Sequence, residues 1–191
     1  SLLLLIVLNL FCLKLYSQVC PKDSSTINYT QVKFEYPAVD NASNYLIQLA
    51  ESPNLTSYKE YQCVTNLKII RDLKFGKYYK WRVLAFDKNK RLIDSTSYFL
   101  FAIKGVGLVN KELFNFRLIS YDSVSSNNNL TFIYYNRVAI NKMGEPVWYL
   151  PDIENKVSNT ERIRDLRMTY DGNFTFLNNR SAIECDINGT V

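Results

Sequence analysis

The chain has 191 residues, of which 47% are hydrophobic and 14% aromatic, with 23 Lys and Arg against 18 Asp and Glu. This composition excludes a disordered chain, and the length suits one or two domains with real cores. The formal charge of +5 does not indicate a nucleic-acid partner, because the basic residues are interspersed with acids, as in 161–165, and do not gather on one element.

The aromatic residues favour strands over helices. Fourteen Tyr and eleven Phe stand beside only six Gly, and aromatic and β-branched side chains suit a pleated, half-buried surface. We therefore expect an all-β protein.

An apolar run opens the chain. Leu2 to Leu13 is almost continuously hydrophobic and is followed by the polar Tyr16-Ser17-Gln18, which is the pattern of a secretory signal peptide. We assign residues 1–18 to a signal whose start is missing, since Ser1 stands in place of Met, and expect a secreted or periplasmic protein. The alternative is a short anchor helix, but Lys14 interrupts the run before the roughly 20 residues of a membrane span. No span is expected after signal removal.

Four cysteines occur, and Cys12 lies inside this signal. Of the remaining Cys20, Cys63 and Cys185, the first two can pair in an oxidising compartment, a question that the sequence leaves open. None has the spacing of a zinc or redox motif, so we expect no metal and no cofactor.

Alternating residues mark the first strands after the signal. Val32, Phe34 and Tyr36 share one face of the segment 30–36, which has the period of a half-buried strand. Pro37 and the polar cluster 40–44 then form a turn before the next apolar run, at 45–49.

A corner feeds a later strand. Leu73, Gly76 and Tyr79 recur at intervals of three before an alternating run through Trp81 and Val83. This spacing resembles the tyrosine corner of fibronectin type III domains, and the resemblance covers about residues 21–101, although Tyr36 stands where Trp is usual. It implies a β-sandwich over residues 19–101, a Tyr79 hydroxyl that bonds back to the backbone, and a last strand over 95–101.

Glycines mark a linker at 102–112, and a repeated turn follows it. Strands are expected at 114–119 and 130–135, and an Asp-Gly hairpin at 171–172. The segments 139–148 and 183–191 each run from an apolar strand into an Asn- or Asp-containing turn, with Gly144 and Gly189 lying 45 residues apart. That spacing fits one β-propeller blade, so residues 113–191 are predicted to be opening blades of an incomplete β-propeller, and the chain a fragment.

Those turns, with the Val147-Trp148 pair and the Asp171-Gly172 hairpin, resemble secreted arylsulfotransferase-like propellers over about residues 113–191. The resemblance implies sulfuryl transfer from a phenolic sulfate donor to a phenol acceptor through a histidine nucleophile. The chain contains no histidine. Its catalytic site residues are therefore expected to be none, and the nucleophile of the intact parent to lie beyond Val191.

Three groups of residues are candidates for a binding site for sugar, anion or calcium, and for each we favour a structural interpretation. The aromatic residues of the sandwich suit a core better than a sugar platform, the arginines lie beside acids on a solvated face, and isolated turn aspartates serve their own backbone. These groups are Phe34, Tyr79 and Trp81; Arg162, Arg164 and Arg167; and Asp152, Asp171 and Asp186.

A second function remains open beside the enzyme fragment. It is a secreted, non-catalytic binding or adhesion protein, in which a fibronectin-like module and a propeller bind a carbohydrate, peptide or cell-surface partner. Asn-x-Ser/Thr sequons also recur, but chance produces many in an Asn-rich chain, so the sequence leaves open whether any of them is glycosylated. The sequons begin at Asn28, Asn41, Asn54, Asn129, Asn173, Asn179 and Asn188.

Overall fold

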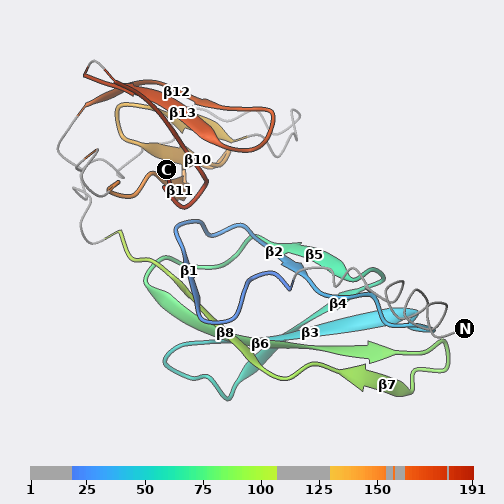
Figure 1. The fold of residues 1–191 in the computed structure, drawn as a ribbon. Coiled ribbons are helices and arrows are strands. Elements are labelled where there is room, and N and C mark those ends of the chain that lie inside the picture. Colours follow the sequence, from blue (N-terminus) through green and yellow to red (C-terminus); the bar gives the residue numbers. More distant parts are fainter. Residues whose placement is uncertain (1–18, 107–129, 154–156, 158–161, 180) are drawn as a thin grey trace, which may run out of the picture.

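The computed structural model describes residues 19–106, 130–153, 157, 162–179 and 181–191 (Figure 1). Every regular element in these ranges is a strand, which confirms the all-β prediction. The predicted signal peptide 1–18, the predicted strand 114–119 and most of the linker 102–112 lie outside the described residues. Over the described ranges, no helix has the length and hydrophobicity to cross a membrane.

The strands form two groups, one before and one after residues 107–129. The first group is β1 (Ser25–Ile27), β2 (Val32–Glu35), β3 (Asn44–Glu51), β4 (Tyr58–Cys63), β5 (Leu67–Ile70), β6 (Lys77–Phe86), β7 (Leu92–Ser95) and β8 (Phe99–Ile103). The second is β9 (Thr131–Ile133), β10 (Val138–Ile140), β11 (Pro146–Tyr149), β12 (Ile163–Met168), β13 (Phe174–Asn178) and β14 (Ser181–Cys185).

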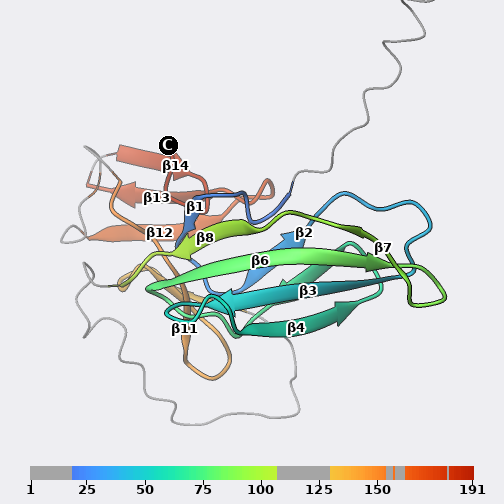
Figure 2. The same ribbon diagram turned by 90° about the horizontal axis from the view of Figure 1, so that it is seen from below.

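The first group is a β-sandwich. One sheet has the order β1-β8-β6-β3-β4, with β7 paired to β6, and β2 pairs with β5 in the other. Figure 2 shows the long strands β6, β3 and β4 side by side. The amino-terminal segment joins both sheets, because Cys20 forms a bridge with Glu35 of β2 while β1 runs parallel to β8.

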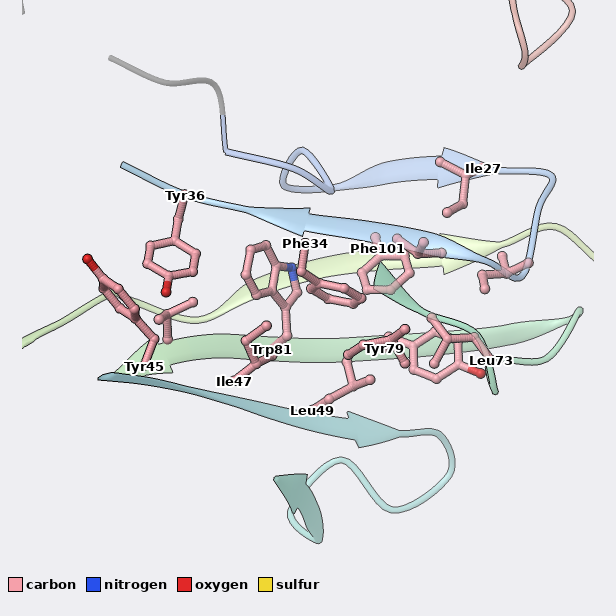
Figure 3. Close-up of a cluster of buried hydrophobic side chains, with 14 of the residues drawn as sticks. Ile27, Phe34, Tyr36, Tyr45, Ile47, Leu49, Leu73, Tyr79, Trp81 and Phe101 are labelled. Atoms are coloured by element: carbon pink, nitrogen blue, oxygen red, sulfur yellow. The ribbon is translucent and has the colours of Figure 1, made fainter. Parts of the chain in front are cut away.

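Aromatic side chains fill the space between the two sheets (Figure 3). Phe34 and Trp81 are both fully buried, with ring centroids 4.9 Å apart in edge-to-face contact, and Tyr79 stacks on Phe101 at 5.1 Å. Burial of rings this large supplies much of a domain's stability. The core interpretation of Phe34, Tyr79 and Trp81 is therefore confirmed, and none of them is available to stack a sugar.

The tyrosine corner is present as predicted. The Tyr79 hydroxyl accepts a hydrogen bond from the Lys74 N–H at 2.8 Å and donates one to Glu51 Oε2 at 3.1 Å. Gly76 turns the chain with φ of +74°, and its N–H donates to the Ile103 carbonyl at 2.9 Å. The corner thereby ties the start of β6 to β3 and to the end of β8.

The last strand differs from the prediction of 95–101. It is divided into β7 and β8, and between them Thr96 pairs with Val83 of β6 through its N–H at 2.9 Å and its hydroxyl at 3.0 Å. β8 continues to Ile103, and Lys104 N–H still donates to Ile27 O at 2.7 Å. Sheet pairing therefore reaches two to three residues into the range predicted as linker, since those backbone groups find partners on β1.

The second group consists of two antiparallel meanders, β9-β10-β11 and β12-β13-β14. They share one core, in which Trp148 of β11 stacks on Phe174 of β13 with ring centroids 4.5 Å apart. Around this pair lie other buried side chains from both meanders, including Ala139, Phe176 and Cys185. The described meanders do not by themselves form a ring.

One turn occurs four times in the described part of the chain, and two of these copies belong to the repeat predicted from sequence. In each copy the first residue's N–H donates to the carbonyl of the fifth, and the fourth residue's N–H donates back to the carbonyl of the first. The fourth residue always has positive φ, as in a three-residue hairpin loop with a glycine bulge. The copies are Asp87–Arg91, Asn141–Glu145, Thr169–Asn173 and Asp186–Thr190. Since one copy lies inside the sandwich, the turn marks a hairpin and is not specific to a propeller blade.

Candidate functional site

The arginine and aspartate groups are placed as the structural interpretation predicted. Arg164 and Arg167 lie exposed on β12, whose bulge at Asp165, with φ of +56°, shifts the alternation so that these two face solvent together. Arg162, which directly precedes the strand, is exposed as well. Arg162 lies over the Tyr135 ring, 5.6 Å from its centroid.

Of the three turn aspartates named from the sequence, Asp186 serves its own backbone. Asp186 Oδ1 accepts hydrogen bonds from the N–H groups of Asn188 and Thr190 at 2.9 and 2.8 Å, as expected for an Asx turn. Across the described part of the chain, no cluster of three His, Cys, Asp or Glu side chains has the arrangement of a metal site. Cys20, Cys63 and Cys185 are all free thiols, so the structure does not join the first two.

A groove opens at the side of the sandwich, between β4 and the segment that leads into the tyrosine corner. It encloses about 740 Å³ and is floored by Leu49 and Tyr79. Its charges are neutralised internally, because Lys59 forms an ion pair with Asp72, and Lys74 lies 3.4 Å from Glu51. Burial raises the pKa of Asp72, but Lys59 more than offsets this and holds it below the usual value. This groove offers a ligand few unpaired groups.

A different surface lies on the outer face of the larger sheet, on the side away from the core. Tyr58 of β4 and Tyr98, just before β8, lie nearly parallel with ring centroids 5.8 Å apart and 22° between their planes. Lys80 Nζ lies 4.2 Å and Arg82 Cζ 4.7 Å from the centroid of Tyr98. We call these four residues the outer-face patch.

Alternation along β6 sets this arrangement. Tyr79, Trp81 and Val83 are buried, whereas Lys80 and Arg82 between them are only half-buried, so both cations project from the outer face. The Tyr98 ring lies across them, which is the geometry of a cation–π contact. Sequence reasoning missed the patch because Tyr58 and Tyr98 are 40 positions apart and meet only once the sheet has formed.

Polar contacts fix the patch in place. Arg82 Nε donates to Gln48 Oε1 at 2.8 Å, and Gln48 Nε2 donates to Glu60 Oε1 at 2.7 Å. Among the described residues, neither Lys80 nor Arg82 forms an ion pair with a carboxylate. The patch therefore holds two positive charges that no carboxylate of the described residues pairs with.

The two hydroxyl groups of the patch influence each other. The contact with Tyr98, helped by Lys80 and Arg82, lowers the pKa of the Tyr58 hydroxyl, and the same contact with Tyr58 raises the pKa of Tyr98. Opposite directions are expected when one hydroxyl donates to the other and nearby cations stabilise the acceptor's negative charge.

The sandwich contacts the meanders through an interface between residues 28–30 and β11, which we call the docking seam. The segment 28–30 lies along β11, where Tyr29 bridges Trp148 and the Thr30 N–H donates to Val147 O at 2.9 Å. Asn28 is buried, and its Nδ2 donates to the carbonyls of Tyr149 and Ile187 at 2.6 and 2.9 Å. The two parts of the molecule are thus held together by β-pairing and by a buried amide.

No known protein family matches the chain, and no curated protein matches it. Among solved structures it is similar to the twitchin kinase region from C. elegans (Fn31-NL-kin-CRD-Ig26), with 17% sequence identity and a TM-score of 0.33. The match covers 86% of this chain and 31% of that one, so the chain spans about a third of the twitchin structure. The similarity assigns no family.

Proposed function

We propose that the chain is the recognition part of a secreted binding protein, and that it binds a carbohydrate or protein partner through the outer-face patch. The observation that carries this proposal is the combination of two stacked tyrosine rings, one exposed and one half-buried, with two cations that lack an ion-pair partner among the described residues. Aromatic residues and Arg are enriched where proteins bind partners.

The surroundings of the patch also favour binding. Tyr78 and Leu100, on the same face, are 66% and 47% exposed, and they extend the apolar surface next to Lys80. Contiguous exposed apolar surface on a soluble domain marks interaction sites. The lateral groove is the weaker candidate, because its lysines are already paired with Asp72 and Glu51.

Binding of the fluorescently labelled chain to cell surfaces and extracellular matrix tests the proposal. We expect the Lys80→Gln/Arg82→Gln variant to lose binding at least tenfold, because it removes both cations and keeps a polar side chain with part of the aliphatic stem at each position. The Lys22→Gln/Lys88→Gln variant removes the same charge from exposed positions elsewhere and is expected to bind like the parent chain. Equal binding by all three proteins contradicts the proposal.

A second candidate function is that of an arylsulfotransferase-like parent, of which residues 113–191 are opening blades of an incomplete β-propeller. It is favoured by the two consecutive antiparallel meanders and by the Val147-Trp148 pair in β11, directly after the Gly144 turn. Blades of a propeller are such antiparallel meanders.

This second candidate is tested on the protein encoded by the whole gene. Further repeats at about 45-residue spacing, with a histidine on an inner strand, together with sulfuryl transfer from 4-nitrophenyl sulfate to phenol, are the expected result. A gene without further repeats, or one whose repeats contain no histidine, contradicts it and leaves the binding function in place.

A further inference from the structure

We infer that the ligand of the outer-face patch is an anionic carbohydrate, one that carries sulfate or carboxylate groups on its sugar rings. The inference rests on the proposed binding function and names the chemical class of its partner. It follows from two separate requirements of the patch, for negative charge and for a flat apolar ring face.

The charge requirement comes from Lys80 and Arg82. Both are on one strand, two residues apart, and point to the same side of the sheet. Neither has a carboxylate partner among the described residues, although Glu60 lies within reach of their neighbour Gln48. The chain also has a net charge of +5, so an anionic ligand is attracted at long range as well as locally.

The ring requirement comes from Tyr58 and Tyr98. The two rings are stacked with only 22° between their planes, and the cations of β6 lie over the Tyr98 ring, while Tyr98 as a residue remains 40% exposed. A sugar ring presents a C–H face that can lie on such aromatic rings, and its charged substituents reach the cations at the ring edge.

Other partners satisfy only one of the two requirements. A purely acidic peptide segment such as poly-glutamate supplies carboxylates but no saturated ring to cover the tyrosines, and a neutral sugar supplies the ring without charge. Arg82 is also held in position by Gln48, so its guanidinium is already oriented before the ligand arrives, which reduces the ordering cost of binding.

The test is a titration of the full chain, labelled with ¹⁵N, with dextran sulfate, neutral dextran and poly-glutamate. We expect dextran sulfate to shift the amide resonances of Tyr58, Lys80 and Tyr98, and its affinity to fall as salt screens the charges. Neutral dextran is expected to shift none of them, and poly-glutamate to bind at least tenfold more weakly than dextran sulfate.

Two variants separate the requirements. Lys80→Gln/Arg82→Gln is expected to weaken dextran sulfate binding at least tenfold, whereas Lys22→Gln/Lys88→Gln changes it less than twofold. Tyr98→Leu keeps the apolar cover of the sheet but removes the flat ring, and is expected to weaken dextran sulfate about tenfold while leaving poly-glutamate unchanged. Amide resonances of residues outside the patch that keep their positions in the spectrum of a variant confirm that the variant is folded.

Two results overturn the inference. If poly-glutamate binds as tightly as dextran sulfate and Tyr98→Leu has no effect, the patch recognises only negative charge. That result fits an acidic protein partner. Absence of any shift with dextran sulfate excludes an anionic carbohydrate. In both cases the proposed binding function fails only if cell-surface binding is also insensitive to Lys80→Gln/Arg82→Gln, so the two failures are distinguishable.

Discussion

At the scale of single residues, Tyr79 shows how one hydroxyl stabilises a corner. It accepts from the Lys74 N–H and donates to the Glu51 carboxylate, inside a side chain that is 1% exposed. A buried N–H that loses its acceptor costs more free energy than an average hydrogen bond contributes. Loss of the Tyr79 hydroxyl is therefore expected to destabilise the fold by more than one average hydrogen bond.

We predict that Tyr79→Phe lowers the free energy of unfolding by about 1–3 kcal/mol, because the ring still packs on Phe101 but the Lys74 N–H loses its acceptor. The measurement is the midpoint of urea unfolding at unchanged slope. Tyr78→Phe is the matched control, since Tyr78 is 66% exposed, and it is expected to stay within about 0.5 kcal/mol. Equal effects at both positions contradict the corner's role.

The thiols also differ residue by residue. Burial, with Asp186 and Glu184 adding to it, raises the pKa of Cys185 to about 11. At pH 8 its reactive thiolate is therefore scarce, and the side chain is 2% exposed. Cys20 and Cys63 are half-buried free thiols, whose pKa values burial raises as well.

We predict that iodoacetamide at pH 8 labels Cys20 and Cys63 of a Cys12→Ala chain while Cys185 reacts only after denaturation, because the thiolate is the reactive form. Raising the pH toward 11 is expected to increase the Cys185 rate, since more of its thiol is then ionised. Mass spectrometry of peptides reads out the sites. Labelling of Cys185 as fast as Cys63 under native conditions contradicts its burial.

At the scale of elements, the recurring turn shows what a hairpin needs from its sequence. Its fourth position has positive φ in every copy and is Gly144, Gly172 or Gly189 in the meanders but Lys90 in the sandwich. An L-residue in this region costs roughly 1–2 kcal/mol. Glycine is therefore favoured at the position, and a side chain such as that of Lys90 is accommodated with strain.

Two glycines of this turn make a matched pair for mutation. Gly172→Ala meets nothing within 4 Å, whereas a Cβ at Gly189 lies 2.7 Å from Pro151 Cγ. We predict that Gly172→Ala costs about 1–2 kcal/mol from backbone strain alone and that Gly189→Ala costs more, because the clash adds to the same strain. Thermal unfolding of both variants checks this order, and a smaller loss for Gly189→Ala contradicts it.

At the scale of the whole molecule, the docking seam decides how the sandwich and the meanders are joined. Segment 28–30 adds its backbone to the edge of β11, through Tyr29 and Thr30, and so covers an edge that otherwise invites pairing with another chain. Asn28 belongs to a sequon, yet it is 3% exposed, and its Nδ2 is occupied by two carbonyl groups. A glycan on Asn28 is incompatible with this docked arrangement.

We predict that Asn28→Ala loosens the seam, because two buried carbonyl groups lose their donor, at a cost of about 1–3 kcal/mol. The amide hydrogens of Thr30 and Tyr149, which cross the seam, are expected to exchange at least tenfold faster, whereas amides in the middle of β6 are unchanged. Asn89→Ala, at an exposed loop position, is the control. Unchanged exchange at Thr30 contradicts the role of Asn28.

The sequence determined much of the local structure. Alternation in 30–36, the Leu73-Gly76-Tyr79 spacing and the Asp171-Gly172 pair each predicted an element that the structure contains, because strand period and turn chemistry depend on near neighbours. The same locality limited the prediction of architecture. The turn of Gly144 and Gly189 was interpreted as a blade repeat, yet it also occurs at Asp87–Arg91, since hairpin geometry does not depend on the fold around it.

Only the tertiary structure decided what depends on distant pairs. The bulge at Asp165 placed Arg167 on the exposed side together with Arg164, and the seam between Asn28 and β11 spans more than a hundred residues. The outer-face patch likewise needs β4, β6 and the segment before β8 in one sheet before Tyr58, Lys80, Arg82 and Tyr98 can meet. Sequence patterns record the faces of single strands, whereas a site of this kind is set by strand order and register, which form only when the sheet assembles.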